Sequence, residues 1–184
     1  MKKFIISVLG KDRPGIIAAV TQVLFEQNFN IEDVSQTILQ TQFSSILVVT
    51  GPDRMAPGML CDLLSTRTSA LNMHFHAREL SADEGPWTAC DCEHFVITTR
   101  GPDRKGLVAA ITAVLADFNV NVTQLRAAFR GGDKPDHNVM IYEVDIPVDV
   151  DQGRLNAALK AKGEALGLEV NIQHQNIFEA INRI

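Results

Sequence analysis

Two stretches of this chain repeat one pattern, and this repeat limits the possible folds more than any other feature. Phe4–Leu39 aligns with Phe95–Arg130 without a gap, and about a third of the aligned positions are identical. The shared centre reads Gly-Lys-Asp-Arg-Pro-Gly at 10–15 and Gly-Pro-Asp-Arg-Lys-Gly at 101–106. We therefore expect the 184 residues to form two copies of one module of about 90 residues, which is a usual domain size.

Each copy begins with a strand pattern that is followed by a helix pattern. A short apolar run that leads into a glycine-bounded turn, at 4–9 and at 95–99, predicts a buried strand. Apolar residues at the i, i+4, i+7 and i+8 spacing then predict a helix with one buried face. These residues are Ile16, Val20, Val23 and Leu24 in the first copy, and Leu107, Ile111, Val114 and Leu115 in the second.

After the helix the apolar period changes to two, which is typical of a strand with one buried face. On this pattern we expect a core face made of Val34, Gln36 and Ile38 in the first copy, and of Leu125, Ala127 and Phe129 in the second. A third strand is predicted at 45–49 and 139–146, a second helix at 57–66 and 152–165, and a last strand at 72–79 and 168–173.

The resulting order in each copy is βαββαβ. This order predicts an α+β protein with two tandem ferredoxin-like domains, each a four-stranded antiparallel sheet with both helices on one face. We expect the first domain at residues 1–80, a polar linker at 81–92 that contains Trp87, and the second domain at 93–184 with a short terminal helix from Ile177 to Ile184. The hairpin loop of the second copy, at 131–137, is longer than its counterpart at 40–42.

Each module also leaves an edge strand that needs a partner. Proteins usually cover or pair such edges, and the segment from Val34 to Ile38 carries no evident protection. We therefore expect the protein to self-associate, as a homodimer, through one continuous eight-stranded sheet. The sequence leaves open whether the modules pair within one chain or between two.

Charge and composition exclude several classes of protein. The formal net charge is −5 and there is no long basic run, so direct binding of nucleic acid is not expected. No apolar run approaches the roughly 20 residues of a membrane span, and the run after Met1 is too short for a signal peptide. Three cysteines leave one unpaired in any disulfide scheme, which favours a cytoplasmic protein.

The motif at the first turn and the asparagine after the first helix resemble the ACT family. The most specific stretch runs from Gly10 to Ile31. Two such domains with nothing else resemble the glycine-cleavage repressor type of ACT protein. In the family, amino-acid ligands lie at the interface between paired ACT domains. The resemblance implies a first set of ligand-binding residues, Asp12, Arg13, Pro14, Gly15, Ile16 and Asn30, and a second set, Asp103, Arg104, Gly106, Leu107 and Asn121.

The chemistry of these residues suits a free α-amino acid. The N–H groups at a helix start near Gly15 can bind a carboxylate with the help of the helix dipole. Asp12 can accept from an ammonium group, and Asn30 offers both a donor and an acceptor. The second copy has Lys105 in place of Pro14, and this cation can change the preference of that site or block it.

A purely structural interpretation of the same residues remains open. Pro14 suits a helix start, the glycines suit a tight turn, and Asp12 suits a helix cap. Asn30 suits a left-handed turn conformation, which asparagine tolerates. Both interpretations can hold together.

No motif in the chain predicts catalysis or a cofactor. There is no G-x-S-x-G, no H-E-x-x-H and no dinucleotide-type glycine loop. His74 and His76 share a strand face, and a second group of metal-ligand types lies at 90–94, but the spacing is not that of a zinc site. We expect no metal site. The basic residues near Arg100 and Arg126 are typical of a solvated face, although they leave phosphate binding open.

The sequence therefore predicts a non-enzymatic amino-acid sensor that acts through a protein partner. By resemblance, glycine or serine is the first candidate ligand, and any effect on transcription is indirect. Two alternatives remain: an interaction module that has lost its ligand site, and a metal- or phosphate-binding fragment of an enzyme.

Overall fold

The structure is a computed structural model that describes residues 1–81, 91–129 and 138–176. Three predicted features lie outside these ranges: the linker around Trp87, the hairpin loop at 131–137 and the terminal helix at 177–184. The chain divides into two compact units, Met1–Pro86 and Trp87–Ile184, and each is described by itself.

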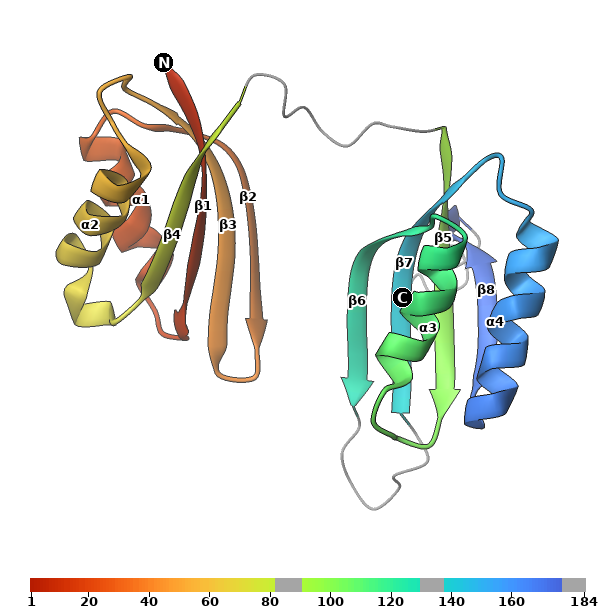
Figure 1. Cartoon of the computed structure of the whole chain (residues 1–184). Helices are drawn as coiled ribbons and strands as arrows, with labels where there is room; N and C mark the ends of the chain where they lie inside the picture. Colours follow the sequence, from red (N-terminus) through yellow and green to blue (C-terminus); the bar gives the residue numbers. More distant parts are fainter. Residues whose placement is uncertain (82–90, 130–137, 177–184) are drawn as a thin grey trace. The chain divides into compact units, whose positions relative to one another are not determined.

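The first unit is one antiparallel sheet with two helices on one face (Figure 1). Its sheet has the strand order β2-β3-β1-β4, which makes β1 a central strand and β2 an edge strand. The elements are β1 (Lys2–Lys11), α1 (Ile16–Glu26), β2 (Asn30–Leu39), β3 (Gln42–Gly51), α2 (Pro57–Arg67), the 3₁₀ helix η1 (Ser69–Leu71) and β4 (His74–Leu80). This confirms the predicted fold class for the first copy.

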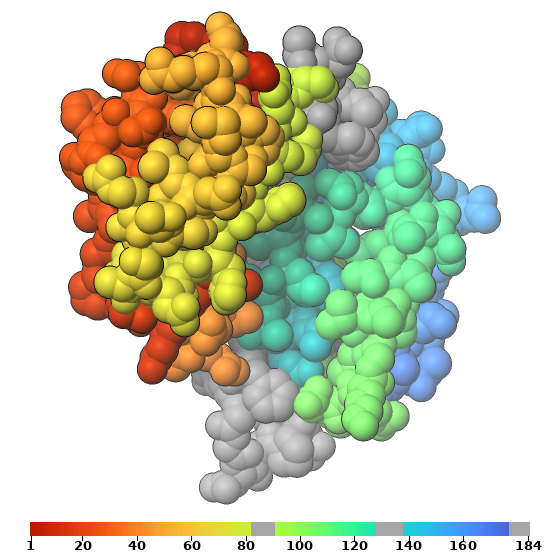
Figure 2. All heavy atoms as spheres, turned by 60° about the vertical axis from the view of Figure 1, so that its left-hand side comes forward, coloured from red at the N-terminus to blue at the C-terminus, as the bar shows by residue number. Residues whose placement is uncertain are grey.

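The second unit repeats this arrangement with the strand order β6-β7-β5-β8. Its elements are β5 (Cys92–Gly101), α3 (Leu107–Asp117), β6 (Asn121–Phe129), β7 (Asn138–Pro147), α4 (Gln152–Leu166) and β8 (Glu169–His174). In Figure 2 the gold spheres of α2 and the green spheres of α3 lie on the outer surface of their units. No helix within the described ranges is long and apolar enough to span a membrane.

The core of each unit lies between the sheet and its two helices. Phe4, Ile6 and Val8 alternate along β1 and are fully or almost fully buried. The helical residues that the apolar spacing singled out are all buried in α1 and α3, which confirms that prediction. Fully burying one such side chain contributes about 1.5–3 kcal/mol to the free energy of unfolding. The apolar face of the helix and the apolar face of the sheet therefore hold each helix on its sheet.

Both first helices end in the same way, at an asparagine with a left-handed backbone. Asn28 has φ 59° and Asn119 has φ 56°. The N–H of Phe29 donates to the carbonyl of Leu24 at 2.9 Å, and the N–H of Asn28 donates to that of Phe25 at 3.0 Å. This pair of bonds is a Schellman motif, which satisfies carbonyls that the helix end would leave free. The first asparagine of each Asn-x-Asn pair therefore has the left-handed conformation, and the prediction of that role for Asn30 was wrong.

The edge strands are much more exposed than the sequence predicted. Val34 and Ile38 face the helix side of the sheet, opposite Leu47 and Phe43, but each keeps 51% of its surface exposed. Leu125 of β6 is 42% exposed. The predicted burial of this face was wrong because β2 and β6 lie at the sheet edge, and it fails for Val34, Gln36, Ile38, Leu125 and Ala127. The side chain of Phe129, also predicted on this face, lies outside the described part of the chain. Each edge therefore carries apolar side chains in water.

Gly51 and Gly58 give a matched test of the packing in the first unit. A Cβ on Gly51 would lie 2.1 Å from the ring of Phe29, whereas a Cβ on Gly58 in α2 would meet nothing within 4 Å. We predict that Gly51→Ala lowers the free energy of unfolding by about 1–3 kcal/mol through overpacking. Gly58→Ala should raise it by up to about 1 kcal/mol through helix propensity. Urea denaturation followed by circular dichroism measures both, and equal midpoints for the two variants would contradict the packing described.

Candidate functional site

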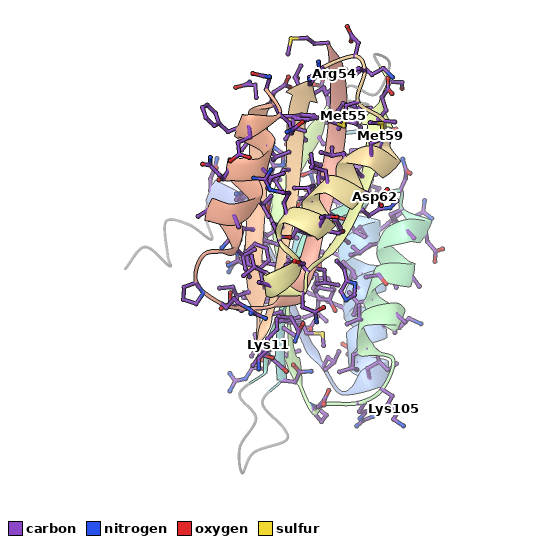
Figure 3. The ribbon with its side chains drawn as sticks, turned by 90° about the vertical axis from the view of Figure 1, so that its left-hand side faces the viewer. Lys11, Arg54, Met55, Met59, Asp62 and Lys105 are labelled. Carbon is purple, nitrogen blue, oxygen red and sulfur yellow. The ribbon has the colours of Figure 1, made fainter. Side chains whose placement is uncertain are left out.

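The first predicted ligand-binding turn lies at one end of the sheet, between β1 and α1. Figure 3 places Lys11 at this end and Arg54 at the opposite end of the unit. Asp12, Arg13, Pro14 and Gly15 are all exposed. The backbone N–H of Asp12 donates to the carbonyl of Thr41 at 2.9 Å, which holds the turn against the β2–β3 hairpin.

Gly15 is the residue that caps α1. It has φ 93°, a left-handed conformation that glycine adopts without strain, and no side chain caps the helix. The predictions that Asp12 caps the helix and that Pro14 starts it were wrong, because α1 begins at Ile16, after Gly15. The N–H groups of the first helical turn thus lack a side-chain acceptor, which is the usual basis of an anion site.

The side chains of Ile16 and Leu107 cannot line a ligand pocket in this structure. They are 2% and 3% exposed and belong to the cores of their units. Only their backbone N–H groups, at the starts of α1 and α3, remain available for a ligand.

The arginine of the motif is used within its own unit. Arg13 donates from Nη1 to the carbonyl of Ala70 at 3.2 Å, so it joins the turn to η1. In the second unit, a Cβ added at Gly167 would lie 3.6 Å from Nη2 of Arg104. Both guanidinium groups therefore reach toward the connection that precedes the last strand of the unit.

Asn30 lies far from the turn of its own unit. It opens β2 opposite Thr50, which pairs with Lys3, whereas Gly10 pairs with Phe43 at the other end of β1. The strand between Lys3 and Gly10 spans roughly 23 Å at about 3.3 Å per residue. Asn30 and the turn that starts at Gly10 therefore lie at opposite ends of the sheet, and one amino acid cannot touch both within one unit.

The asparagine ends of the two sheets carry different charges. Asn30 lies near an ion pair in which Lys3 Nζ is 2.6 Å from Glu32 Oε2, and this bond, together with one to Thr50, lowers the pKa of Glu32. Asn121 lies directly opposite Asp145, whose Oδ1 is 2.6 Å from Nδ1 of His94. The side chains of Asn30 and Asn121 are exposed and make no hydrogen bond within the described part of the chain.

The second turn has the same backbone as the first but a different interior contact. Gly106 caps α3 with φ 86°, again without a side-chain cap. Lys105 is exposed before it, and Figure 3 shows it at the outer end of the turn. Asp103 Oδ1 accepts a hydrogen bond from Nδ2 of Asn138 at 3.2 Å. Asn138 was missed by the sequence analysis, because the gapless repeat ends before the longer hairpin loop.

Other hollows lie away from these turns. On the face of each sheet opposite the helices there is a shallow cavity, of about 180 Å³ in the first unit and about 240 Å³ in the second. The first is lined by Ile5, Ser7, Ile46, His76 and Arg78, and the second by Thr98, Arg100, Val139, Glu169 and Asn171. Over residues 1–81, 91–129 and 138–176, no three His, Cys, Asp or Glu side chains form a group that suits a metal ion.

Comparisons with known proteins agree with this geometry. The UPF0237 protein of Methanococcus maripaludis is 39% identical over 93 residues, which make up 50% of this chain and 99% of that protein. A UPF0237 protein of Methanosarcina acetivorans is 36% identical over 91 residues, or 49% of this chain and 95% of that one. Each of these relatives therefore has about the length of one unit.

Two solved structures match across both units. An unknown protein from Galdieria sulphuraria has a TM-score of 0.73 at 24% identity, over 94% of this chain and 98% of that one. A structure described as a candidate glycine cleavage system transcriptional repressor has a TM-score of 0.66 at 15% identity, over 94% and 96%. At these identities the matches show a shared fold.

The family model of the ACT domain matches residues 2–78 and 93–173. These two ranges hold the two βαββαβ units and both glycine-capped turns. The protein therefore belongs to the ACT domain family, with one ACT domain in each half of the chain.

Proposed function

We propose that this protein is a non-enzymatic regulatory protein that senses a small amino acid and acts through a protein partner. The observation that carries the proposal is an uncapped helix start beside an aspartate, present in both ACT domains. A zwitterion needs donors for its carboxylate and acceptors for its ammonium group only a few ångströms away. The N–H groups after Gly15 supply the donors for the carboxylate, and the carboxylate of Asp12 supplies the acceptors for the ammonium group.

The energies of such contacts suit a reversible sensor. A negative group at a helix start gains typically about 0.3–1 kcal/mol, and up to about 2 kcal/mol when it is partly buried. A hydrogen bond to a charged group contributes about 1.5–3 kcal/mol. Several such contacts together support binding in the range between millimolar and micromolar, where a metabolite level can change occupancy.

A complete site of this kind needs two ACT domains. If two edge strands β2 pair in an antiparallel manner, the Asn30 end of one strand lies beside the Leu39 end of the other. Leu39 is next to the hairpin that binds the backbone of Asp12. Pairing would therefore bring Asn30 of one domain to the turn of its neighbour, which reunites the two parts that are separated within a unit.

The exposure of the edge strands supports this pairing. Val34 and Ile38 of β2, and Leu125 of β6, lie on edges whose apolar side chains are about half exposed. Strand pairing would bury these side chains and satisfy the free backbone groups of the edge. The domains can pair as two copies of β2, two copies of β6, or one of each, within one chain or in a homodimer.

Glycine or serine is the proposed ligand, and the cytoplasm is the proposed location. The name of the candidate glycine cleavage system repressor, which shares the two-domain fold, supports a small amino acid. Any control of transcription would be indirect, because a formal net charge of −5 does not favour contact with nucleic acid. The chain would pass the signal to a regulatory protein instead.

A second candidate function is an interaction module without an amino-acid ligand. The half-exposed apolar residues of β2 and β6 favour it, since such edges also accept a strand from another protein. The two candidates differ in one measurable respect, which is the response to free amino acids.

We predict that one or two of the twenty amino acids raise the melting temperature of the intact protein. A ligand at one hundred times its Kd adds about 2.7 kcal/mol of stability when it binds only the folded state. A thermal-shift screen at millimolar ligand measures this change in melting temperature. Acetate, which has only the carboxylate, and methylamine, which has only the ammonium group, are the controls. A flat response to all twenty amino acids would favour the interaction module.

Asn30 and Asn28 form a matched pair for the site itself. We predict that Asn30→Ala weakens binding of the amino acid found in the screen by about ten- to a hundredfold, because one hydrogen bond to a charged group is lost. The exposed side chain leaves folding almost unchanged. Asn28→Ala should lower the free energy of unfolding and leave ligand affinity unchanged, since alanine in a left-handed conformation costs about 1–2 kcal/mol.

Isothermal titration calorimetry and urea denaturation separate these two effects. Asp12→Asn tests the ammonium contact and should weaken amino acids more than simple carboxylates. Normal calorimetric binding by a folded Asn30→Ala protein would remove Asn30 from the site and leave it only a structural role.

Val34→Lys and Leu125→Lys test which edge pairs. Both residues are exposed on edge strands at equivalent places in the repeat. We predict that a lysine on the edge in use blocks pairing and lowers ligand affinity, while the other variant stays normal. Sedimentation velocity at about 10 μM and calorimetry measure the two effects. If both variants match the wild-type protein in mass and affinity, edge pairing is not the basis of the site.

A further inference from the structure

The second unit contains a buried amide at a place where the first unit contains a phenyl ring. Asn138 opens β7 opposite Gly101 and is 5% exposed. Phe43 holds the same place in the first unit, opposite Gly10, and is 2% exposed. Both residues lie under the turn that leads into the first helix of their unit, so the interiors of the two turns differ in polarity.

Only the nitrogen of the Asn138 side-chain amide makes a hydrogen bond; the oxygen makes none within the described part of the chain. Nδ2 of Asn138 donates to Asp103 Oδ1 at 3.2 Å, and Oδ1 of Asn138 is buried. Leaving a buried acceptor without a donor is unfavourable in a folded protein, and such groups are rare. The second ACT domain therefore keeps a polar group that a packing role alone would not require.

Further polar groups follow Asn138 along the same face of the sheet. Thr99 is 3% exposed and Tyr142 is fully buried, and burial raises the pKa of the Tyr142 hydroxyl while a hydrogen bond with Thr99 acts against it. The matching residues of the first unit are Val8 and Leu47, which carry no polar atoms on their side chains. These two buried positions therefore carry hydroxyl groups in the second unit and only apolar atoms in the first.

We infer that Asn138 and Asp103 form a two-acceptor site for the ammonium group of an amino acid bound at the start of α3. This inference rests on the proposed function and assigns a specificity-determining residue, from β7, to the second ACT domain. An ammonium group has three N–H donors, and the carboxylate of Asp103 with the free Oδ1 of Asn138 supplies acceptors for two of them.

The carboxylate of the same ligand meets the N–H groups that follow Gly106. A Cβ added to Gly106 would meet nothing within 4 Å, so the approach to this helix start is open. At the matching position of the first ACT domain, Phe43 offers no acceptor to add to the carboxylate of Asp12. The two domains therefore differ in how strictly they require an amine.

The test uses Asn138→Leu in the full-length chain, because leucine has nearly the shape of asparagine without its polar atoms. Glycine and serine are the amino-acid probes, and acetate and 3-hydroxypropanoate are the matching carboxylates without the amine. We expect calorimetry to show a ten- to hundredfold loss of glycine or serine affinity at one class of sites. Acetate and 3-hydroxypropanoate should bind as weakly as they do to the wild-type protein.

Three further variants separate this role from a structural one. Asp103→Asn should cause the same loss, and the double variant should lose less than the product of the two single losses, because the residues share one ammonium group. Phe43→Leu, the equivalent position of the first domain, should leave all affinities unchanged. The urea midpoint of Asn138→Leu should equal or exceed that of the wild-type protein, because the unsatisfied oxygen is gone.

Two outcomes would overturn the inference, and they are distinguishable. If the wild-type protein binds neither glycine nor serine, the proposed ligand class and this inference both fail. If the wild-type protein binds and a folded Asn138→Leu protein binds equally well, the sensor function stands and Asn138 has no part in it.

Discussion

Each unit depends on a central strand that is hydrogen-bonded on both sides. The register of β1 with β3 and β4 fixes where the strand ends, and the first helix starts only a few residues later. Gly10 leaves the space that Met73 occupies at the end of β1, because a Cβ on Gly10 would lie 2.6 Å from the sulfur of Met73. In the second unit, a Cβ on Gly101 would lie 2.7 Å from the carbonyl oxygen of Gly167. The first glycine of the motif is thus a packing requirement, and the last, Gly15, is a backbone requirement. Together they leave an uncapped helix start at the sheet end.

The duplicated domains share this framework and differ inside it. Their strand orders, their bulges and their helix ends correspond, down to the Schellman bonds that follow Leu24 and Leu115. The buried residue under the turn differs, however, because it is Phe43 in the first copy and Asn138 in the second. The backbone of the turn is held by main-chain hydrogen bonds and by glycines. It tolerates the exchange of a phenyl ring for an amide, because neither the hydrogen bonds nor the glycines depend on that side chain.

Local periodicity predicted the helices and the central strands because their buried faces repeat at the spacing of the backbone. It failed at β2, where alternation predicted burial for Val34 and Ile38, but burial also depends on whether a helix lies above the strand. The separation of Asn30 from the turn could have been foreseen, because the 11 residues of α1 carry the chain to the other end of the sheet. Asn138 could not be found by the gapless repeat; only strand register pairs it with Gly101.

The half-exposed edge strand has a consequence for the behaviour of these domains at high concentration. Val34, Ile38 and the more exposed Leu39 lie on β2, a strand of ten residues. From Val34 to Leu39 this strand contains neither a charged residue nor a proline. Natural proteins use such residues to keep free edges from recruiting further strands, and this edge has none of them along that half. A single unit, separated from any partner, would thus retain a template for aggregation. The covalent link between two ACT domains keeps a second edge at a high local concentration, which can favour an orderly pair over open-ended assembly.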